Sequence, residues 1–212
     1  MKSKLLVEGK YDDRVIRKIC ERISLPFEER FEIQGKGGIQ PLLDSLEVEL
    51  DGRSDVVAII CDADEDCGLR WDEIQIACRK AGLEFGDEAP APGGFIWNRA
   101  GQQKFACWIM PDNRQSGALE GRLLDGIASA EQQLLREQAR AFIERVEPRL
   151  FPDTEAALQK ATLRAWFAVQ EEPIWLPSFG VGHLLLLPKL EENDAFVAWL
   201  RELEAVAGLT AV

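Results

Sequence analysis

The first half of the chain alternates between short apolar runs and longer segments whose apolar residues recur at helical spacing. The apolar runs predict strands over residues 4–8, 31–34 and 55–61. The periodic segments predict helices over residues 11–23, 39–50 and 69–81. Such alternation is typical of an α/β fold, in which a mostly parallel sheet carries helices on both faces.

The second half predicts two more strands followed by a helical region. Residues 95–98 and 104–110 are strand-like, and a turn at Ala100-Gly101 would join them. Helices are expected over residues 118–127, 129–146, 156–169 and 194–207. The second of these helices has an apolar stripe formed by Leu134, Leu135, Ala139, Phe142, Ile143 and Val146. We therefore expect an α/β domain over residues 1–127 and a helical C-terminal extension over residues 128–212, packed on it.

The composition predicts a soluble protein with a substantial core. Of the 212 residues, 46% are hydrophobic, which is ordinary for a globular protein. The apolar run Leu5 to Val7 is too short for a signal peptide, and Leu184 to Leu187 is too short to span a bilayer. The five cysteines form no Cys-x-x-Cys pair, which argues against a zinc ribbon or a redox motif. We expect a cytoplasmic protein with reduced cysteines and no membrane segment.

The acidic net charge bears on whether the protein binds nucleic acid by itself. Lys and Arg total 25 against 37 Asp and Glu, which gives a net charge of −12. This balance argues against a simple nucleic-acid coat protein, because phosphate binding needs local positive charge. It does not exclude a nuclease, since a bound metal ion changes the local field. Tight binding of DNA would then be shared with a partner.

Two acidic clusters follow two of the predicted strands. Glu8 ends the first strand and Asp12 follows it by four residues, while Asp62 and Asp64 follow the run Val56 to Cys61. Ligands of open α/β sheets bind at the carboxyl ends of the strands. Carboxylates gathered there repel one another, and a hard divalent cation such as Mg²⁺ offsets that repulsion. We interpret the two clusters as one metal site for phosphate chemistry.

Each cluster also has a simpler interpretation. Asp12 or Asp13 would cap a helix and Glu8 would be exposed, since capping carboxylates are common. The acids from Asp62 to Asp66 would form a solvated turn. Their position at the end of a strongly apolar strand favours the metal site. If Asp62 and Asp64 both belonged to a strand, their side chains would point to the same face.

The two acidic motifs, Leu6-Val7-Glu8-Gly9 and Cys61-Asp62-Ala63-Asp64-Glu65-Asp66, resemble those of the toprim domain. Topoisomerases, primases and overcoming-lysogenization-defect type nucleases share this Rossmann-like metal-binding fold. The nuclease branch also carries an Asp four residues after the Glu, which Asp12 matches. This resemblance covers about the first 125 residues.

A narrower resemblance, to an uncharacterised family of small stand-alone toprim-like proteins, covers most of the chain. It rests also on Trp108 to Asn113, Gly117 to Glu120, Ala165 to Ala168 and Gln170 to Pro173. The toprim resemblance implies that Glu8 is catalytic, as a metal ligand or general acid/base, and that Asp62 and Asp64 bind metal. Glu120 is a further candidate ligand, with a solvent-facing helix position as the alternative.

Several other residues are expected to have structural rather than catalytic roles. Asp112 is expected in a turn or cap. No Gly-x-x-x-x-Gly-Lys-Ser/Thr motif occurs, and Gly35 to Gly38 is expected to be a strand-to-helix turn. The only tyrosine, Tyr11, lies among the acids, which argues against topoisomerase chemistry. Four basic residues could contact phosphate but are expected on the solvated surface: Lys10, Arg14, Arg70 and Arg114. A hydrophobic lid over the helical part, with a partner surface as the alternative, is expected for Trp166, Trp175, Phe179 and His183.

The leading functional hypothesis is a Mg²⁺- or Mn²⁺-dependent phosphodiester hydrolase, a nuclease-like enzyme that acts on nucleic acid. Its catalytic residues would be Glu8, Asp62 and Asp64, and its metal ligands Glu8, Asp12, Asp62, Asp64 and Glu120. One alternative is a non-catalytic toprim module that works only with a partner ATPase or DNA-binding protein. Another is a hydrolase of nucleotides or other small phosphate compounds. The sequence leaves the oligomeric state open.

Overall fold

A mostly parallel sheet forms the centre of the molecule. A computed structural model of the chain describes residues 2–52, 54–86, 88, 90–98, 103–183, 186–187 and 194–208. The strands of these residues are β1 (Ser3–Val7), β2 (Phe31–Gly35), β3 (Val56–Asp62), β4 (Phe95–Trp97) and β5 (Lys104–Met110). They lie in the order β2-β1-β3-β5-β4, and only β4 runs antiparallel to its neighbour. The predicted Rossmann-like α/β class is confirmed.

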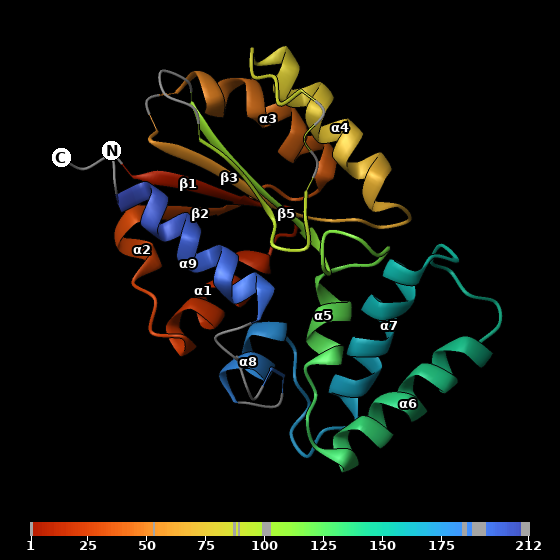
Figure 1. Ribbon diagram of the computed structural model, residues 1–212. Coiled ribbons are helices and arrows are strands. Elements are labelled where there is room, and N and C mark those ends of the chain that lie inside the picture. Colours follow the sequence, from red (N-terminus) through yellow and green to blue (C-terminus); the bar gives the residue numbers. More distant parts are fainter. Residues whose placement is uncertain are drawn as a thin grey trace.

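Helices cover both faces of this sheet (Figure 1). On one face lie α3 (Ile39–Asp51) and α4 (Cys67–Lys80). On the other lie α1 (Asp12–Arg22), α2 (Phe27–Arg30) and α9 (Ala195–Gly208). Successive strand residues face opposite sides, so Ala58 and Ile60 pack with one helix layer and Ile59 packs with the other. Strands buried on both faces explain the continuous apolar runs of the sequence.

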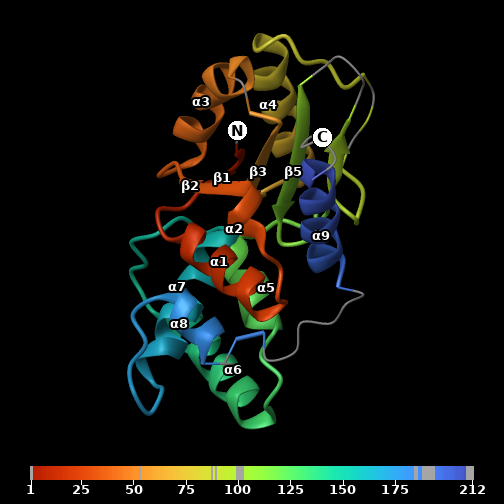
Figure 2. The same cartoon turned by 90° about the vertical axis from the view of Figure 1, so that its left-hand side faces the viewer.

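The remaining helices stand beyond the carboxyl ends of the strands (Figures 1 and 2). They are α5 (Leu119–Asp125), α6 (Ala130–Arg145), α7 (Glu155–Ala168) and α8 (Pro177–Gly182). Helix α7 packs against both α5 and α6, and α8 packs against α1. The core on the α1 face continues into this region through Leu123, Leu163 and Trp166. The helical part therefore lies next to the edge where the acidic motifs end.

The short helices α2 and α8 were not expected, because four and six residues are too few to show a helical period. The turn at Ala100-Gly101 lies outside the described residues. The division at residue 127 stays a prediction. Helix α9 returns to the sheet, where Phe196 and Trp199 contact Trp108.

The apolar stripe expected on the α6 segment is only partly a core stripe. Ala139 is buried and Leu135 packs against the core, whereas Leu134, Phe142 and Val146 are exposed. The reason is that α6 packs mainly against a single helix, α7, and its outer side has no neighbour among the described elements.

Within the described part of the chain, no helix is both long enough and apolar enough to cross a bilayer.

Candidate functional site

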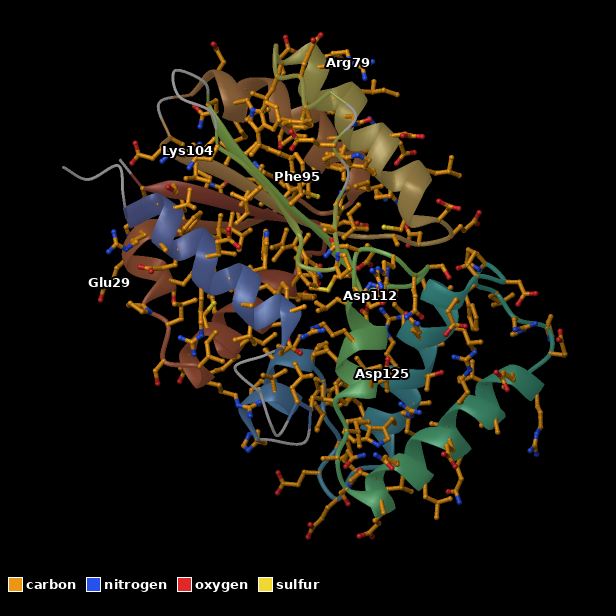
Figure 3. The ribbon with its side chains drawn as sticks, viewed as in Figure 1. Glu29, Arg79, Phe95, Lys104, Asp112 and Asp125 are labelled. Atoms are coloured by element: carbon orange, nitrogen blue, oxygen red, sulfur yellow. The ribbon has the colours of Figure 1, made fainter. Side chains whose placement is uncertain are left out.

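The topology brings the predicted acids to one edge of the sheet. Strands β1, β3 and β5 are parallel neighbours, so their carboxyl ends meet. Glu8 follows β1, Asp62 ends β3, and the chain after β5 turns through residues 111–118 into α5, where Glu120 lies. Figure 3 shows Asp112 in this connection, between the sheet and α5. The three segments are thus placed together by strand order alone.

Backbone contacts hold Glu8 against β3. The amide of Asp62 donates to Oε2 of Glu8 over 3.0 Å, and the amide of Glu8 donates to the carbonyl of Ile60 over 3.1 Å. The amides of Gly37 and Gly38 both donate to the carbonyl of Glu8 over 2.9 Å. The segment Gly35 to Gly38 is therefore the strand-to-helix turn predicted from the sequence, and it anchors the backbone of Glu8.

Asp12 is the first residue of α1, and its carboxylate folds back toward the end of β1. Its Oδ2 accepts a hydrogen bond of 2.7 Å from the amide of Gly9. A Cβ atom at Gly9 would collide with both carboxylate oxygens of Asp12, so the close approach depends on glycine. Asp12 thus satisfies a backbone amide near the helix N-terminus, and its carboxyl is close enough to Asp62 and Lys160 for their charges to affect its pKa.

Asp62 is the most constrained carboxylate of the cluster. It is only 5% exposed. Its Oδ1 accepts from the amide of Leu119 over 2.9 Å, and its Oδ2 lies 2.8 Å from the ammonium nitrogen of Lys160. The period of β3 explains this direction, because Asp62 shares the face of Ala58 and Ile60, on which the α1, α5 and α7 side chains pack. Both carboxylate oxygens are therefore engaged.

Asp64 does not extend the strand, so the expected shared strand face of Asp62 and Asp64 is wrong. Strand β3 ends at Asp62, and Asp64 adopts a left-handed conformation with φ 53°. Its backbone exchanges two hydrogen bonds of 2.9 Å with Gly117. Its Oδ2 pairs with Nη2 of Arg70 over 2.7 Å. The backbone bonds with Gly117 tie the β3 loop to the loop that precedes α5, and the ion pair with Arg70 ties it to α4.

Arg70 is a second cation of the site, and the expectation that it lies in solvent is wrong. It is 8% exposed, because its guanidinium reaches back from α4 to the end of β3. Its Nε donates to the carbonyl of Asp62 over 2.9 Å, and its Nη1 pairs with Glu73 over 2.6 Å. Arg70 therefore holds Asp64 in place and neutralises part of its charge.

Burial and crowding shift the protonation of three acids. Burial, with the charge of Asp62 as the next cause, raises the pKa of Glu8 to about 7 and the pKa of Glu120 to about 7. The same two causes raise the pKa of Asp12 to about 6. Burial opposes the charged form of Lys160, yet the carboxylate of Asp62 beside it raises the pKa of the ammonium above its ordinary value.

Glu120 belongs electrostatically to this cluster, although no hydrogen bond joins it to the other acids. The charges of Asp62, Lys160 and Asp12 all affect the pKa of its carboxyl. This favours the site over the solvent-facing alternative. Asp112 is a turn residue, as predicted, since its Oδ1 accepts from the amides of Arg114 and Gln115 over 3.0 and 2.8 Å.

Two residues of α7 were missed by the sequence reasoning. Lys160 and Gln159 reach the site from a helix far along the chain. Gln159 accepts a hydrogen bond of 2.9 Å from the amide of Ala118 and lies against Gly117 and Gly121, where a Cβ atom would collide with it. No local pattern marks either residue, because lysine and glutamine are ordinary on an amphipathic helix.

A pocket of about 440 Å³ opens beside Asp64. Its lining comes from the loop Ala63 to Asp66, from the first turns of α4, and from Pro152 and Thr154 before α7. The pocket therefore lies between the sheet part and the helical part. This volume is enough for a small ligand or for one or two nucleotide units of a longer chain.

The side chains of the site differ in how well their chemistry and their grouping suit a metal ion. In the described residues, no three His, Cys, Asp or Glu side chains are grouped closely enough to hold an ion as they stand. The clustered donors are carboxylate oxygens, which suit Mg²⁺ and Mn²⁺. Burial first and the charge of Asp62 second raise the pKa values of Glu8, Asp12 and Glu120, and a bound cation would oppose both effects. The chemistry fits such an ion, and an ion on Oδ2 of Asp62 would share that oxygen with Lys160.

These features define an α/β protein with an acidic site at the carboxyl ends of its parallel strands. The chain belongs to the family described as "Protein of unknown function (DUF3226)", which matches residues 2–205. No curated protein and no solved structure matches the chain. The family description names no activity, so the function has to be argued from the site.

Proposed function

We propose that this protein is a Mg²⁺- or Mn²⁺-dependent phosphodiester hydrolase, a cytoplasmic nuclease-like enzyme related to the toprim nucleases. The observation that supports this proposal is the gathering of Glu8, Asp62 and Glu120 around Lys160 at the end of the parallel strands. Clustered carboxylates with raised pKa values are typical of a site that binds a cation.

The metal would be held by carboxylates that the fold already brings together. The proposed ligands are Glu8, Asp12, Asp62, Asp64 and Glu120, and the backbone amide of Asp62 holds the carboxylate of Glu8 beside the end of β3. When bound, the divalent ion supplies Lewis-acid polarisation of a phosphate oxygen. Asp64 is a less favourable ligand than the other four, because its Oδ2 already pairs with Arg70.

The other steps fall to side chains of the chain itself. If Glu8 acts as general acid/base rather than as a ligand, its pKa of about 7 lets it exchange a proton near neutral pH. Lys160 carries a positive charge into a negative site, where it can contact a non-bridging phosphate oxygen or the leaving oxygen. Arg70 keeps the β3 loop in place through Asp64 and the carbonyl of Asp62.

The net charge of −12 bears on the substrate. A chain with this negative charge repels nucleic acid at long range. Productive binding therefore needs a positively charged surface supplied by another molecule. We propose that a partner ATPase or DNA-binding protein supplies it, and that the pocket beside Asp64 takes the scissile segment.

The direct test is cleavage of plasmid and of single-stranded oligonucleotides in Mn²⁺. The variants are Glu8→Gln and Asp62→Asn, which keep side-chain size and remove negative charge. Glu202→Gln is the control, because Glu202 is an exposed acid of α9 that belongs neither to the acidic cluster nor to the lining of the pocket. We expect both site variants to lose activity by about 100-fold or more and the control to retain it. Equal activity in all three variants would contradict the assignment.

The ion pair between Lys160 and Asp62 favours a second candidate, a partner-dependent module without catalysis. In that case the lysine is the permanent counter-ion of the cluster, and no divalent ion is needed. Calorimetric titration with Mn²⁺ separates the two candidates, since only the hydrolase is expected to bind the ion with loss of binding in Asp62→Asn. Parallel assays with nucleotides separate a nuclease from a hydrolase of small phosphates.

A further inference from the structure

The outer side of α6 carries large apolar side chains that no described element covers. Leu134 is 55% exposed and Phe142 is 62% exposed. They lie eight residues apart on one helix, with exposed Gln138 midway, so the three share one face. Figures 1 and 2 show α6 at the outer edge of the helical part, and its inner side packs on α7.

This face has a palindromic order of residues. Glu131 and Arg145 lie seven residues before and after Gln138, and Leu134 and Phe142 lie four residues before and after it. At 100° per residue, these five positions fall on one stripe of the helix. A second copy of α6, reversed about Gln138, would therefore bring Glu131 opposite Arg145, and Leu134 opposite Phe142.

The charges at the two ends of the stripe are available for such a contact. Neither Glu131 nor Arg145 forms an ion pair with any residue that the structure describes. Both are exposed. Reversal of one copy would place an acid opposite a base at each end of the helix pair, whereas parallel copies would place like charges together.

We propose that the protein forms a two-fold symmetric homodimer through antiparallel contact of α6 with α6 of the partner copy, centred on Gln138. The contact is isologous, so each Glu131–Arg145 pair and each Leu134–Phe142 contact occurs twice. This proposal rests on the surface of α6 alone and does not depend on the proposed hydrolase activity.

The size of the contact sets the expected strength. Helix α6 has 16 residues and is about 24 Å long. A single helix pair of this length is at the small end of specific interfaces, so we expect a dissociation constant in the micromolar range.

Sedimentation equilibrium over a range of protein concentrations tests the association. We expect the wild-type chain to dimerise and Phe142→Glu to remain monomeric. Glu131→Arg and Arg145→Glu should each weaken the dimer at least tenfold, because each creates two repulsive pairs. The double variant Glu131→Arg/Arg145→Glu should restore it, since the exchanged charges again pair. A monomeric wild type, or no restoration in the double variant, would overturn the proposal.

Oxidative cross-linking tests the register. The five native cysteines are buried, so an introduced thiol on α6 is the reactive one. Gln138→Cys should form a disulfide-linked dimer, because the two copies of residue 138 meet at the axis. Glu131→Cys is the control on the same face, since its two copies would be separated by about 21 Å. Cross-linking of Glu131→Cys in preference to Gln138→Cys would reject the antiparallel register.

Discussion

Lys160 of α7 lies 2.8 Å from Oδ2 of Asp62 at the end of β3, which joins residues that are 98 positions apart. The pair is the direct electrostatic link between the helical part and the acidic edge of the sheet. Because Asp62 is buried and surrounded by other acids, the lysine offsets repulsion as well as forming a contact. The helical part thus contributes to the site itself.

We expect Lys160→Met to destabilise the protein by about 1–2 kcal/mol, a value reduced from that of a fully buried pair because Lys160 is partly exposed. The loss leaves Asp62 without its counter-ion beside Glu8 and Glu120. Urea denaturation in EDTA measures the change. Arg164→Met is the control, because Arg164 is an exposed basic residue of the same helix. Added Mn²⁺ should stabilise Lys160→Met more than wild type, and equal stabilisation would contradict the shared use of Asp62.

The acids predict an unusual dependence of stability on pH. Glu8 has a folded pKa of about 7 against an ordinary value of 4.5, so the folded state binds its proton more tightly than the unfolded state. Asp12 and Glu120 shift in the same direction. The stabilising contribution is complete below pH 4.5 and is lost as the pH rises through about 7.

Denaturation in EDTA between pH 5 and pH 8 measures this effect. For Glu8 alone we expect a loss of roughly 2 kcal/mol, after allowance for solvent screening at this half-buried carboxyl. Glu8→Gln should flatten the profile, whereas Glu65→Gln, at an exposed position of the loop, should leave it unchanged. A wild-type free energy of unfolding that rises over this range would contradict the crowding of the acids.

Glycine at position 9 is required by the approach of Asp12. Gly9→Ala would force the Asp12 carboxylate away from the amide of residue 9, so we expect a loss of about 1–3 kcal/mol and weaker Mn²⁺ binding. Gly93→Ala is the control, because a Cβ atom there meets no atom within 4 Å. Thermal unfolding with and without Mn²⁺ measures both effects. Equal behaviour of the two variants would show that the turn adapts.

The sequence allowed part of the site to be predicted, for a physical reason. Glu8 and Asp62 both follow apolar strands, and parallel neighbours end at one edge, so their proximity follows from strand order. Lys160 could not be predicted in this way, because the packing angle of α7 decides which of its polar residues reaches the sheet. The spacing of α6 correctly grouped Leu134 with Phe142 but could not show that none of the elements the structure describes covers them.

Arg70 provides a final test of how the β3 loop is held. Arg70→Met keeps the aliphatic stem and removes three donors, to the carbonyl of Asp62 and to the carboxylates of Asp64 and Glu73. We expect a loss of about 1–2 kcal/mol, because the carbonyl of buried Asp62 loses its donor, whereas the carboxylates of Asp64 and Glu73 are partly exposed and water can solvate them. Glu73→Gln removes only the more exposed partner and should change stability by less than about 0.5 kcal/mol. Denaturation of both variants measures the difference.

If Arg70 acts only by holding the loop, Arg70→Met should also weaken Mn²⁺ binding, because Asp64 loses its position. Tighter binding would instead show that Arg70 competes with the ion for Asp64.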